Sequence, residues 1–218
     1  MKSVLVSFPT SPSHPYLHKH VVFASWKLLS DNRYKVTPMI PTHRPVENNF
    51  HHIINDFMAG GFDFWLSIDD DNPPMKNPLD LIELDLDIIG CPTPVWHYDK
   101  NKVGERPVYW NAYKYILEKD AYTEYRPRKG LQMVDAIGAG CFLVAKRVFE
   151  DPEMRTGVFT RQLYPDGRVH KGNDISFSER ARERGFNIYC HFDYPCMHFN
   201  TLELNEVVAA FRGLYEDG

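Results

Sequence analysis

The stretch DFWLSIDDDNPP, residues 63 to 74, decides how this chain is expected to fold. An apolar run over 62–68 ends in three consecutive carboxylates, Asp69, Asp70 and Asp71, and two prolines follow. The alternation of side chains predicts a strand with Trp65 on one face and four residues on the other, Phe62, Phe64, Leu66 and Ile68. Adjacent like charges repel, and the end of a buried strand is a costly place for them. We therefore expect a positive group to belong at this turn.

Strand-like and helical segments alternate along the first half of the chain. The strand-like runs cover 3–8, 34–40, 62–68 and 88–91. Between them apolar residues recur at helical spacing, most clearly over 50–58 before Gly60 and Gly61, and Asn77-Pro78 signals the start of a third helix. This order predicts a mostly parallel sheet covered by helices, in which ligands bind beyond the carboxyl ends of the strands.

The second half adds strands over 108–116, 141–145 and 187–192, and a helix over 174–184 that ends at Gly185. No internal repeat, low-complexity tract or linker is evident. We expect one α/β domain over 1–218, in which a nucleotide-binding half, 1–95, and an acceptor-binding half, 96–218, share a sheet.

Composition excludes several classes of protein. A formal net charge of -4 argues against a generally basic nucleic-acid-binding surface. No run of 18 apolar residues is long enough to span a membrane, and the apolar start breaks at Pro9, before the core of a signal peptide could form. A cytoplasmic protein is the default expectation.

The four cysteines form no CxxC pair, so a structural zinc site has weak support. The stretch CHFDYPCMH does hold Cys190, His191, Cys196 and His198 close together. Reduced, mostly buried thiols are the favoured interpretation.

The aspartate turn suits a hard divalent cation such as Mg²⁺ or Mn²⁺. Asp69 and Asp71 are two residues apart and point to the same side of an extended segment, whereas Asp70 points elsewhere. An EF-hand loop fits badly, because Pro74 occupies the position that needs glycine. The alternative is a solvated turn with helix-capping aspartates.

Four segments in order resemble glycosyltransferases with the GT-A fold, especially the family-2-like inverting enzymes. WLSIDDDNPP is similar to their DxD segment, and IGAGCFLVAKRVFE, 137–150, to their acceptor-side glycine loop. GNDISFSERARERGFNIYC, 172–190, resembles their acidic-pair motif, and CMHF, 196–199, their late histidine. The resemblance spans roughly residues 3 to 200 and implies a Rossmann-like GT-A domain with a central, mostly parallel mixed sheet.

The resemblance also implies roles for the residues at the aspartate turn. Asp71 would be the direct ligand of Mn²⁺ or Mg²⁺, with His198 as the second ligand. Asp69 would hold the ribose or a metal-bound water and counts with them at the metal, and Asp70 would contact the donor, a nucleotide-diphosphate sugar. Such a metal neutralises the charge that develops on the leaving pyrophosphate. For His198 the alternative is a buried histidine near the sheet edge.

Asp174 is the candidate base, which takes the proton of an acceptor hydroxyl. It is expected in the first turn of a helix, where the positive helix end favours its ionised form. The family shows two acids here, whereas this chain has Asn173 and then Asp174. Plain capping by either residue is the alternative.

Further donor contacts are implied before and after the turn. Pro9 and Thr10 follow the first strand, where the family contacts the nucleotide. Arg44, with Asn48 or Asn49, resembles an Arg-Asn feature, although a surface salt bridge is the alternative for Arg44. Gly138 and Gly140 belong to a loop that would lie under the donor sugar and the acceptor, with an ordinary tight turn as the alternative.

The leading hypothesis is metal-dependent transfer of a sugar from a nucleotide diphosphate to a hydroxyl, with inversion. A nucleotidyltransferase shares the sheet and the acidic site, but FPTSPSHPYLHKH, 8–20, lacks the glycine-rich phosphate loop it needs. A non-catalytic carbohydrate-binding or nucleotide-binding protein is the third hypothesis. The acceptor could be a glycan, a protein, a small molecule or a modified DNA base.

Overall fold

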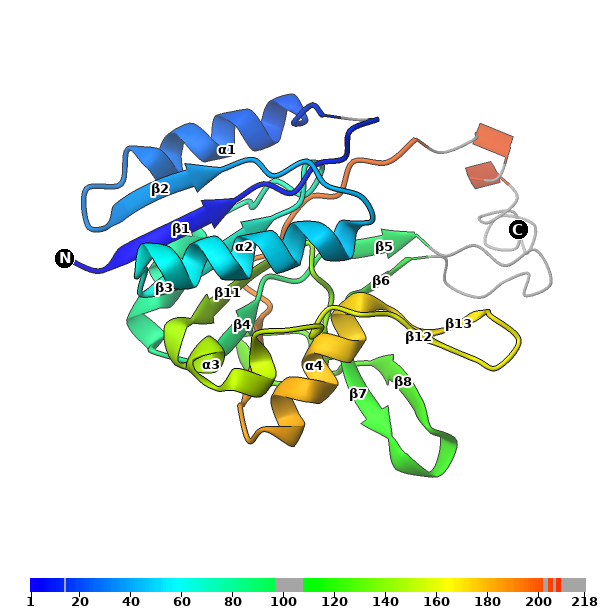
Figure 1. Cartoon of the computed structure of the whole chain (residues 1–218). Coiled ribbons are helices and arrows are strands. Elements are labelled where there is room, and N and C mark those ends of the chain that lie inside the picture. Colours follow the sequence, from blue (N-terminus) through cyan, green and yellow to red (C-terminus); the bar gives the residue numbers. More distant parts are fainter. Residues whose placement is uncertain (14, 97–107, 202–203, 206, 209–218) are drawn as a thin grey trace.

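A seven-stranded sheet forms the centre of the molecule (Figure 1). The computed structural model describes residues 1–13, 15–96, 108–201, 204–205 and 207–208. Five strands run in one direction, whereas β11 and β9 run antiparallel to their neighbours. In spatial order the strands are β2 (Lys35–Met39), β1 (Ser3–Ser7), β3 (Phe64–Ile68), β11 (Cys141–Ala145), β4 (Ile88–Gly90), β14 (Ile188–His191) and β9 (Leu131–Met133).

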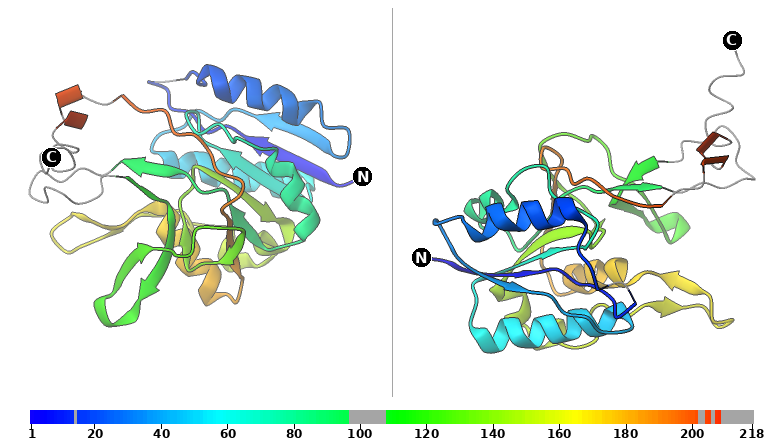
Figure 2. Two further views of the ribbon diagram at one scale, coloured as in Figure 1. Left: turned by 180° about the vertical axis from the view of Figure 1, so that it is seen from behind. Right: turned by 90° about the horizontal axis from the view of Figure 1, so that it is seen from above.

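Helices cover both faces of this sheet (Figure 2). α1 (Lys19–Leu29) and the 3-10 helix η1 (Pro78–Leu84) pack on one face. α2 (Val46–Gly60), α3 (Lys146–Glu150) and α4 (Asn173–Glu183) pack on the other. The structure therefore confirms the expected α/β class with a central, mostly parallel mixed sheet. No helix among the described residues combines the length and the apolar character needed to cross a membrane.

Smaller elements surround the end of the sheet where β1 and β3 terminate. β5 (Pro94–Trp96) pairs with β6 (Val108–Trp110), and β12 (Gln162–Leu163) pairs with β13 (Val169–Lys171). β7 (Ala112–Ile116) lies between β8 (Ala121–Glu124) and β10 (Ala136–Ile137). Two single turns of 3-10 helix, η2 (Leu117–Lys119) and η3 (Pro152–Met154), complete the described elements.

β3 is buried on both faces and joins the two halves of the core. Phe64, Leu66 and Ile68 face α1 and η1, whereas Trp65 faces α2. The Trp65 indole packs against the rings of Phe50, Phe142, Phe149 and Phe159, with centroids 5.0 to 6.1 Å away. Its N–H donates to Ser7 Oγ at 2.8 Å, so no buried donor is left without a partner at this position.

Most predicted elements are confirmed within a residue or two, and three details differ. Phe62 precedes β3 and stacks on Phe57 of α2, so it does not share the face of Phe64. The helix after Asn77 is a 3-10 helix, with the Asn77 side chain accepting the Leu79 N–H at 3.1 Å. The strand expected over 108–116 breaks at Asn111, because the Asn111 side chain accepts the Thr93 N–H at 2.7 Å and turns the chain from β6 into β7.

Candidate active site

A short backbone ladder brings the late histidine to the aspartate turn. Residues 195–199 run beside 71–75, and three N–H groups donate across at 3.0 Å: Phe199 to Asp71 O, Met197 to Pro73 O and Met75 to Pro195 O. The two segments are far apart in the sequence, yet the ladder fixes their register. His198 therefore lies next to Asp71.

The Asp71 and His198 side chains form a pair suited to ligation. His198 Nε2 lies 3.5 Å from Asp71 Oδ2, and the Asn72 amide donates to the other carboxylate oxygen. His198 Nδ1 lies 2.7 Å from the carbonyl oxygen of Pro94, to which it donates. Because the carbonyl only accepts, Nδ1 carries a proton, and the neutral ring has its lone pair on Nε2. The Asp71 carboxylate raises the pKa of His198.

Asp69 is the most perturbed carboxylate at the turn. Its N–H donates to Gly140 O at 2.9 Å, which ties the end of β3 to the loop before β11. Burial raises the pKa of Asp69 well above its usual range, and the neighbouring carboxylates of Asp71, Asp70 and Asp174 add to the effect. The site therefore brings four half-buried carboxyl groups close together.

Two adjoining cavities contain all ten site residues that the sequence singles out. A cavity of about 490 Å³ is lined by Asp69, Asp70, Asp71, Gly138, Gly140, Asp174 and His198. A second, of about 560 Å³, is lined by Pro9, Thr10, Arg44, Asp69 and Asp70. Asp69 and Asp70 lie on the border, since they line both. The ten residues predicted from sequence therefore lie together in one region of the molecule. The roles assigned to them stay predictions.

Asp174 lies in the first turn of α4 and faces the first cavity. Its Oδ1 accepts the Ile175 N–H at 2.8 Å, and its own N–H donates to Asn173 Oδ1 at 2.9 Å. The Ile175 N–H favours the ionised carboxylate, but burial outweighs it and raises the pKa of Asp174. The helix end therefore does not dominate this group as the sequence suggested.

The glycine loop makes room for two asparagines. A Cβ on Gly140 would overlap the Oδ1 of Asn72, and one on Gly138 would overlap the Asn111 amide. Both asparagines are buried and line the same cavity. The glycines therefore let side chains that the sequence did not single out approach the backbone, where a ligand contact was expected.

Asn49, rather than Asn48, ties together the end of the site that Thr10 and Arg44 line. Its side chain donates to Thr10 O at 2.8 Å and accepts the His43 N–H at 2.6 Å. Asn48 instead donates to the carbonyl oxygen of Arg44. The Arg44 guanidinium lies 3.5 Å from Ser11 Oγ and makes no ion pair within the ranges that the structure describes.

Arg161 is a candidate site residue that the sequence reasoning missed. It precedes β12, lines both cavities and has a half-exposed side chain. Its Nε lies 2.7 Å from Glu47 Oε1, which holds the guanidinium beside the border. No local pattern marks this arginine, because only the fold brings it to the aspartates.

The cysteines do not form the zinc quartet that the sequence allowed. All four are buried and free, as favoured. Cys196 lies with Cys91 and Cys141, their sulfurs within 4.8 Å of one another, whereas Cys190 packs on the opposite face of the sheet. Among the described residues, no other three His, Cys, Asp or Glu side chains bring their ligand atoms within 4.8 Å of one another.

The same criterion applies to the aspartate turn. Asp69, Asp71 and His198 do not meet it, so Asp69 lies farther from the Asp71–His198 pair than a third metal ligand would.

Comparison with known proteins shows the fold alone. No family model and no curated protein matches the sequence. The crystal structure of A197 from STIV superposes with a TM-score of 0.57 and 13% identity, over 92% of this chain and 87% of that chain. UDP-glucose pyrophosphorylase complexed with UDP-glucose gives a TM-score of 0.49 and 8% identity over 100% of both chains. GalNAc-T7 with UDP, GalNAc and Mn²⁺ gives 0.46 and 10%, over 93% of this chain and 44% of that chain. The last two similarities are too weak to indicate function.

Substituting Gly140 tests the packing of the loop. Gly140→Ala should lower the free energy of unfolding by about 1–3 kcal/mol, because the new methyl group overlaps the Asn72 amide. Asn72→Ala should relieve much of this cost. The double variant should therefore lose less free energy of unfolding than the two single variants lose together. Urea denaturation of the four proteins measures this coupling, and strictly additive effects would contradict the contact.

Substituting Asp174 tests the effect of its burial. Because the folded state raises the pKa of Asp174, ionisation costs stability above the ordinary aspartate pKa of about 3.9. Asp174→Asn keeps the acceptor oxygen for the Ile175 N–H and removes the charge. Its free energy of unfolding should exceed that of the wild type at pH 7, and the gain should shrink as the pH falls toward 3.9. Denaturation at several pH values measures the gain, and one independent of pH would exclude this cause.

Proposed function

We propose that this protein is a metal-dependent glycosyltransferase that moves a sugar from a nucleotide-diphosphate donor to an acceptor hydroxyl with inversion. One observation carries the proposal: the Asp71–His198 pair and Asp174 line a single cavity, which adjoins a second cavity suited to a nucleotide. The four motifs of the sequence resemblance meet at this cavity.

The Asp71–His198 pair fits Mn²⁺ or Mg²⁺. It offers one carboxylate oxygen and one imidazole nitrogen, and the Pro94 carbonyl holds the ring with its lone pair toward the aspartate. Such ions take few protein ligands when substrate phosphates and waters complete the shell. Bound there, the ion would neutralise charge on the leaving diphosphate. Asp69 would act on the ribose or a metal-bound water.

The donor would occupy the cavity that Pro9, Thr10 and Arg44 line. Arg44 and Arg161 line the same cavity, Arg161 while paired with Glu47, and guanidinium groups bind phosphate oxygens well. This arrangement supports a diphosphate that crosses from the nucleotide cavity to the aspartate turn, where Asp70 would contact it.

Asp174 would act as the base. The acceptor oxygen forms a bond to the anomeric carbon while the bond from that carbon to the diphosphate oxygen breaks, and Asp174 takes the hydroxyl proton. Burial raises the pKa of Asp174 toward neutral pH, and a base whose pKa lies nearer the working pH is a better general base. A single displacement of this kind inverts the anomeric centre. No observation favours the nucleotidyltransferase alternative over this one.

Ligand-dependent stability tests the donor and metal assignments. With Mn²⁺, one of UDP, GDP, CDP and dTDP should stabilise the protein, by roughly 2.7 kcal/mol at 100 times its dissociation constant. A chelator should remove the effect, and so should Asp71→Asn, whereas Asp166→Asn on the exposed turn between β12 and β13 should not. Thermal unfolding measures the shift, and a well-folded protein that responds to none of the four nucleotides would contradict the proposal.

Turnover of the Asp174→Asn variant separates an enzyme from a binding protein. The variant should keep the stabilisation by nucleotide and Mn²⁺ and lose about 10²- to 10⁴-fold in turnover, because only proton transfer is removed. Release of nucleoside diphosphate from donor sugars measures it. Equal turnover in both proteins would rule out Asp174 as the base, and donor binding without any turnover in the wild type would favour the non-catalytic hypothesis.

A further inference from the structure

The outer side of α1 exposes large apolar side chains. The helix buries Val21 and Leu28 against the sheet. Phe23, Trp26 and Leu29 follow one another at a spacing of three along its other side and are 55%, 63% and 43% exposed. The Phe23 and Trp26 rings contact each other edge to face, with centroids 5.6 Å apart. Amphipathic helices normally turn polar residues outward. An exposed apolar stripe such as Phe23, Trp26 and Leu29 is typical of an interaction surface.

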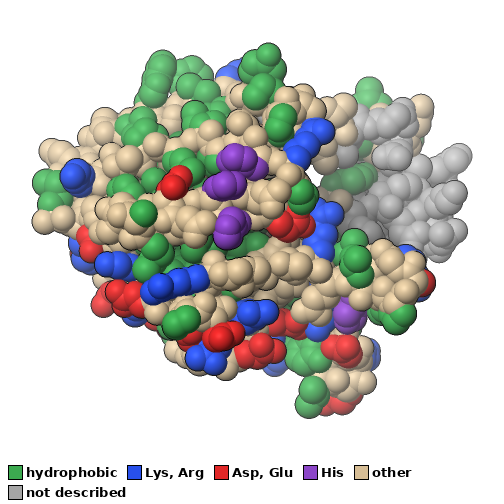
Figure 3. Space-filling view, in the orientation of Figure 1, with side chains coloured by type: hydrophobic (Ala, Val, Ile, Leu, Met, Phe, Trp, Pro, Cys, Tyr) green, Lys and Arg blue, Asp and Glu red, His purple; other side chains and the backbone are tan. Residues whose placement is uncertain are grey.

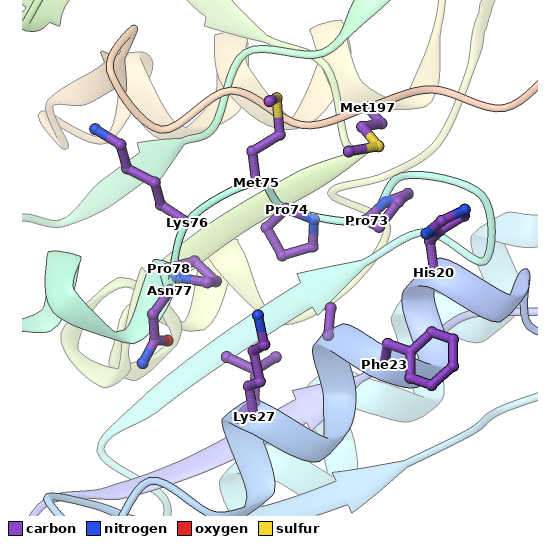
Figure 4. A pocket seen from close by; sticks show the side chains of 12 residues that line it. His20, Phe23, Lys27, Pro73, Pro74, Met75, Lys76, Asn77, Pro78 and Met197 are labelled. Atoms are coloured by element: carbon purple, nitrogen blue, oxygen red, sulfur yellow. The ribbon is translucent and has the colours of Figure 1, made fainter.

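The stripe continues across a groove of about 290 Å³ (Figure 4). His20, Phe23 and Lys27 of α1 line one side, and residues 73–78 with Met197 line the other. Met75 and Met197 are 59% and 40% exposed. Figure 3 shows hydrophobic side chains along the edge of the molecule that α1 forms, with a basic side chain among them. We name this surface the α1 face and define it by Phe23, Trp26, Leu29, Met75 and Met197 with Lys19, Lys27 and Lys76.

The α1 face is basic although the chain as a whole is acidic. Residues 1–30 contain three lysines and no aspartate or glutamate, whereas the net charge is -4. Lys19, Lys27 and Lys76 are exposed and make no ion pair with any described residue. Asp31 and Asp80, beyond the end of α1, are both ion-paired with Arg33 at 2.6 Å. Lys76 lies over the Tyr194 ring, 5.2 Å from its centroid, and no carboxylate of the described residues neutralises the three lysines.

We propose that the α1 face binds an anionic lipid surface. Aromatic and aliphatic side chains flanked by lysines are what helices lying in a membrane interface present, and each lysine adds attraction to anionic headgroups. A protein partner fits less well, because lysine is depleted in protein–protein interfaces. The exposed stripe on α1 suits a soft, extended surface better than a small ligand. The proposal goes beyond the glycosyltransferase assignment and does not depend on it.

Sedimentation with lipid vesicles tests the proposal. The protein should sediment with vesicles made of equal parts phosphatidylserine and phosphatidylcholine. It should bind vesicles of pure phosphatidylcholine only weakly. Binding should weaken as the ionic strength rises from about 0.1 to about 1 M, because the screening length falls from about 10 to about 3 Å. No binding to the anionic vesicles at the lower ionic strength, or equal binding to both kinds, would overturn it.

Variants locate the binding surface. The double variant Phe23→Ala with Trp26→Ala should bind the anionic vesicles at least tenfold more weakly, and Lys27→Glu with Lys76→Glu should lose the preference for them. A matched control, Leu117→Ala with Met133→Ala, removes side chains that are 76% and 61% exposed elsewhere and should bind like the wild type. All of these residues are exposed, so the melting temperature should change little and serves as the check on folding.

Two further outcomes would reject the lipid surface as the occupant. Unchanged vesicle binding of the Phe23→Ala, Trp26→Ala variant would show that another surface binds lipid. A concentration-dependent dimer that this variant abolishes, without vesicle binding by the wild type, would assign the α1 face to a second copy of the chain. Analytical ultracentrifugation of both proteins measures the second outcome.

Discussion

Repulsion among half-buried carboxylates is the constraint around which the site is built. Asp69, Asp70, Asp71 and Asp174 line one cavity, and burial raises the pKa of Asp69 and Asp174. In poorly screened surroundings such charges lower stability. His198 beside Asp71 and the Ile175 N–H on Asp174 each offset a part of this cost. Residues kept together at a cost to stability are typical of a functional site.

Antiparallel strand β11 makes this concentration of charge possible. It lies between β3 and β4, and its first residue, Cys141, pairs with Ile68, the last residue of β3. The glycine loop before β11 therefore lies directly beside the carboxylates that follow β3. The extent of β11, 141–145, was predicted correctly, because side-chain periodicity and glycine signals are local. The same signals identified β1 as a strand and α2 as a helix, although α2 begins four residues before the predicted pattern. The place of β11 between two parallel strands was not predicted, since neighbours in a sheet depend on packing between distant segments.

The candidate site also combines residues that local sequence patterns identify with residues that only the packing of distant segments brings in. Eight of the ten residues named from sequence lie after strand ends, in the glycine loop or in the first turn of α4, and they meet because those elements were identified correctly. Arg44 precedes α2, and backbone bonds to the aspartate turn hold the segment that contains His198. Arg161, Asn72 and Asn111 escaped notice because their positions carry no pattern along the chain. Asn111 also interrupted a strand that propensity alone favours, because its amide bonds to Thr93. A polar side chain that serves a distant backbone group is not visible in sequence.

The candidate active site and the α1 face share one piece of backbone. Pro73, Met75 and Met197 line the groove, and Asp71 and His198 lie next to them on the same two segments. Three N–H···O bonds of 3.0 Å join those segments and fix their register. The same ladder therefore sets the shape of the groove and the distance between Asp71 and His198, so one set of backbone bonds belongs to both sites.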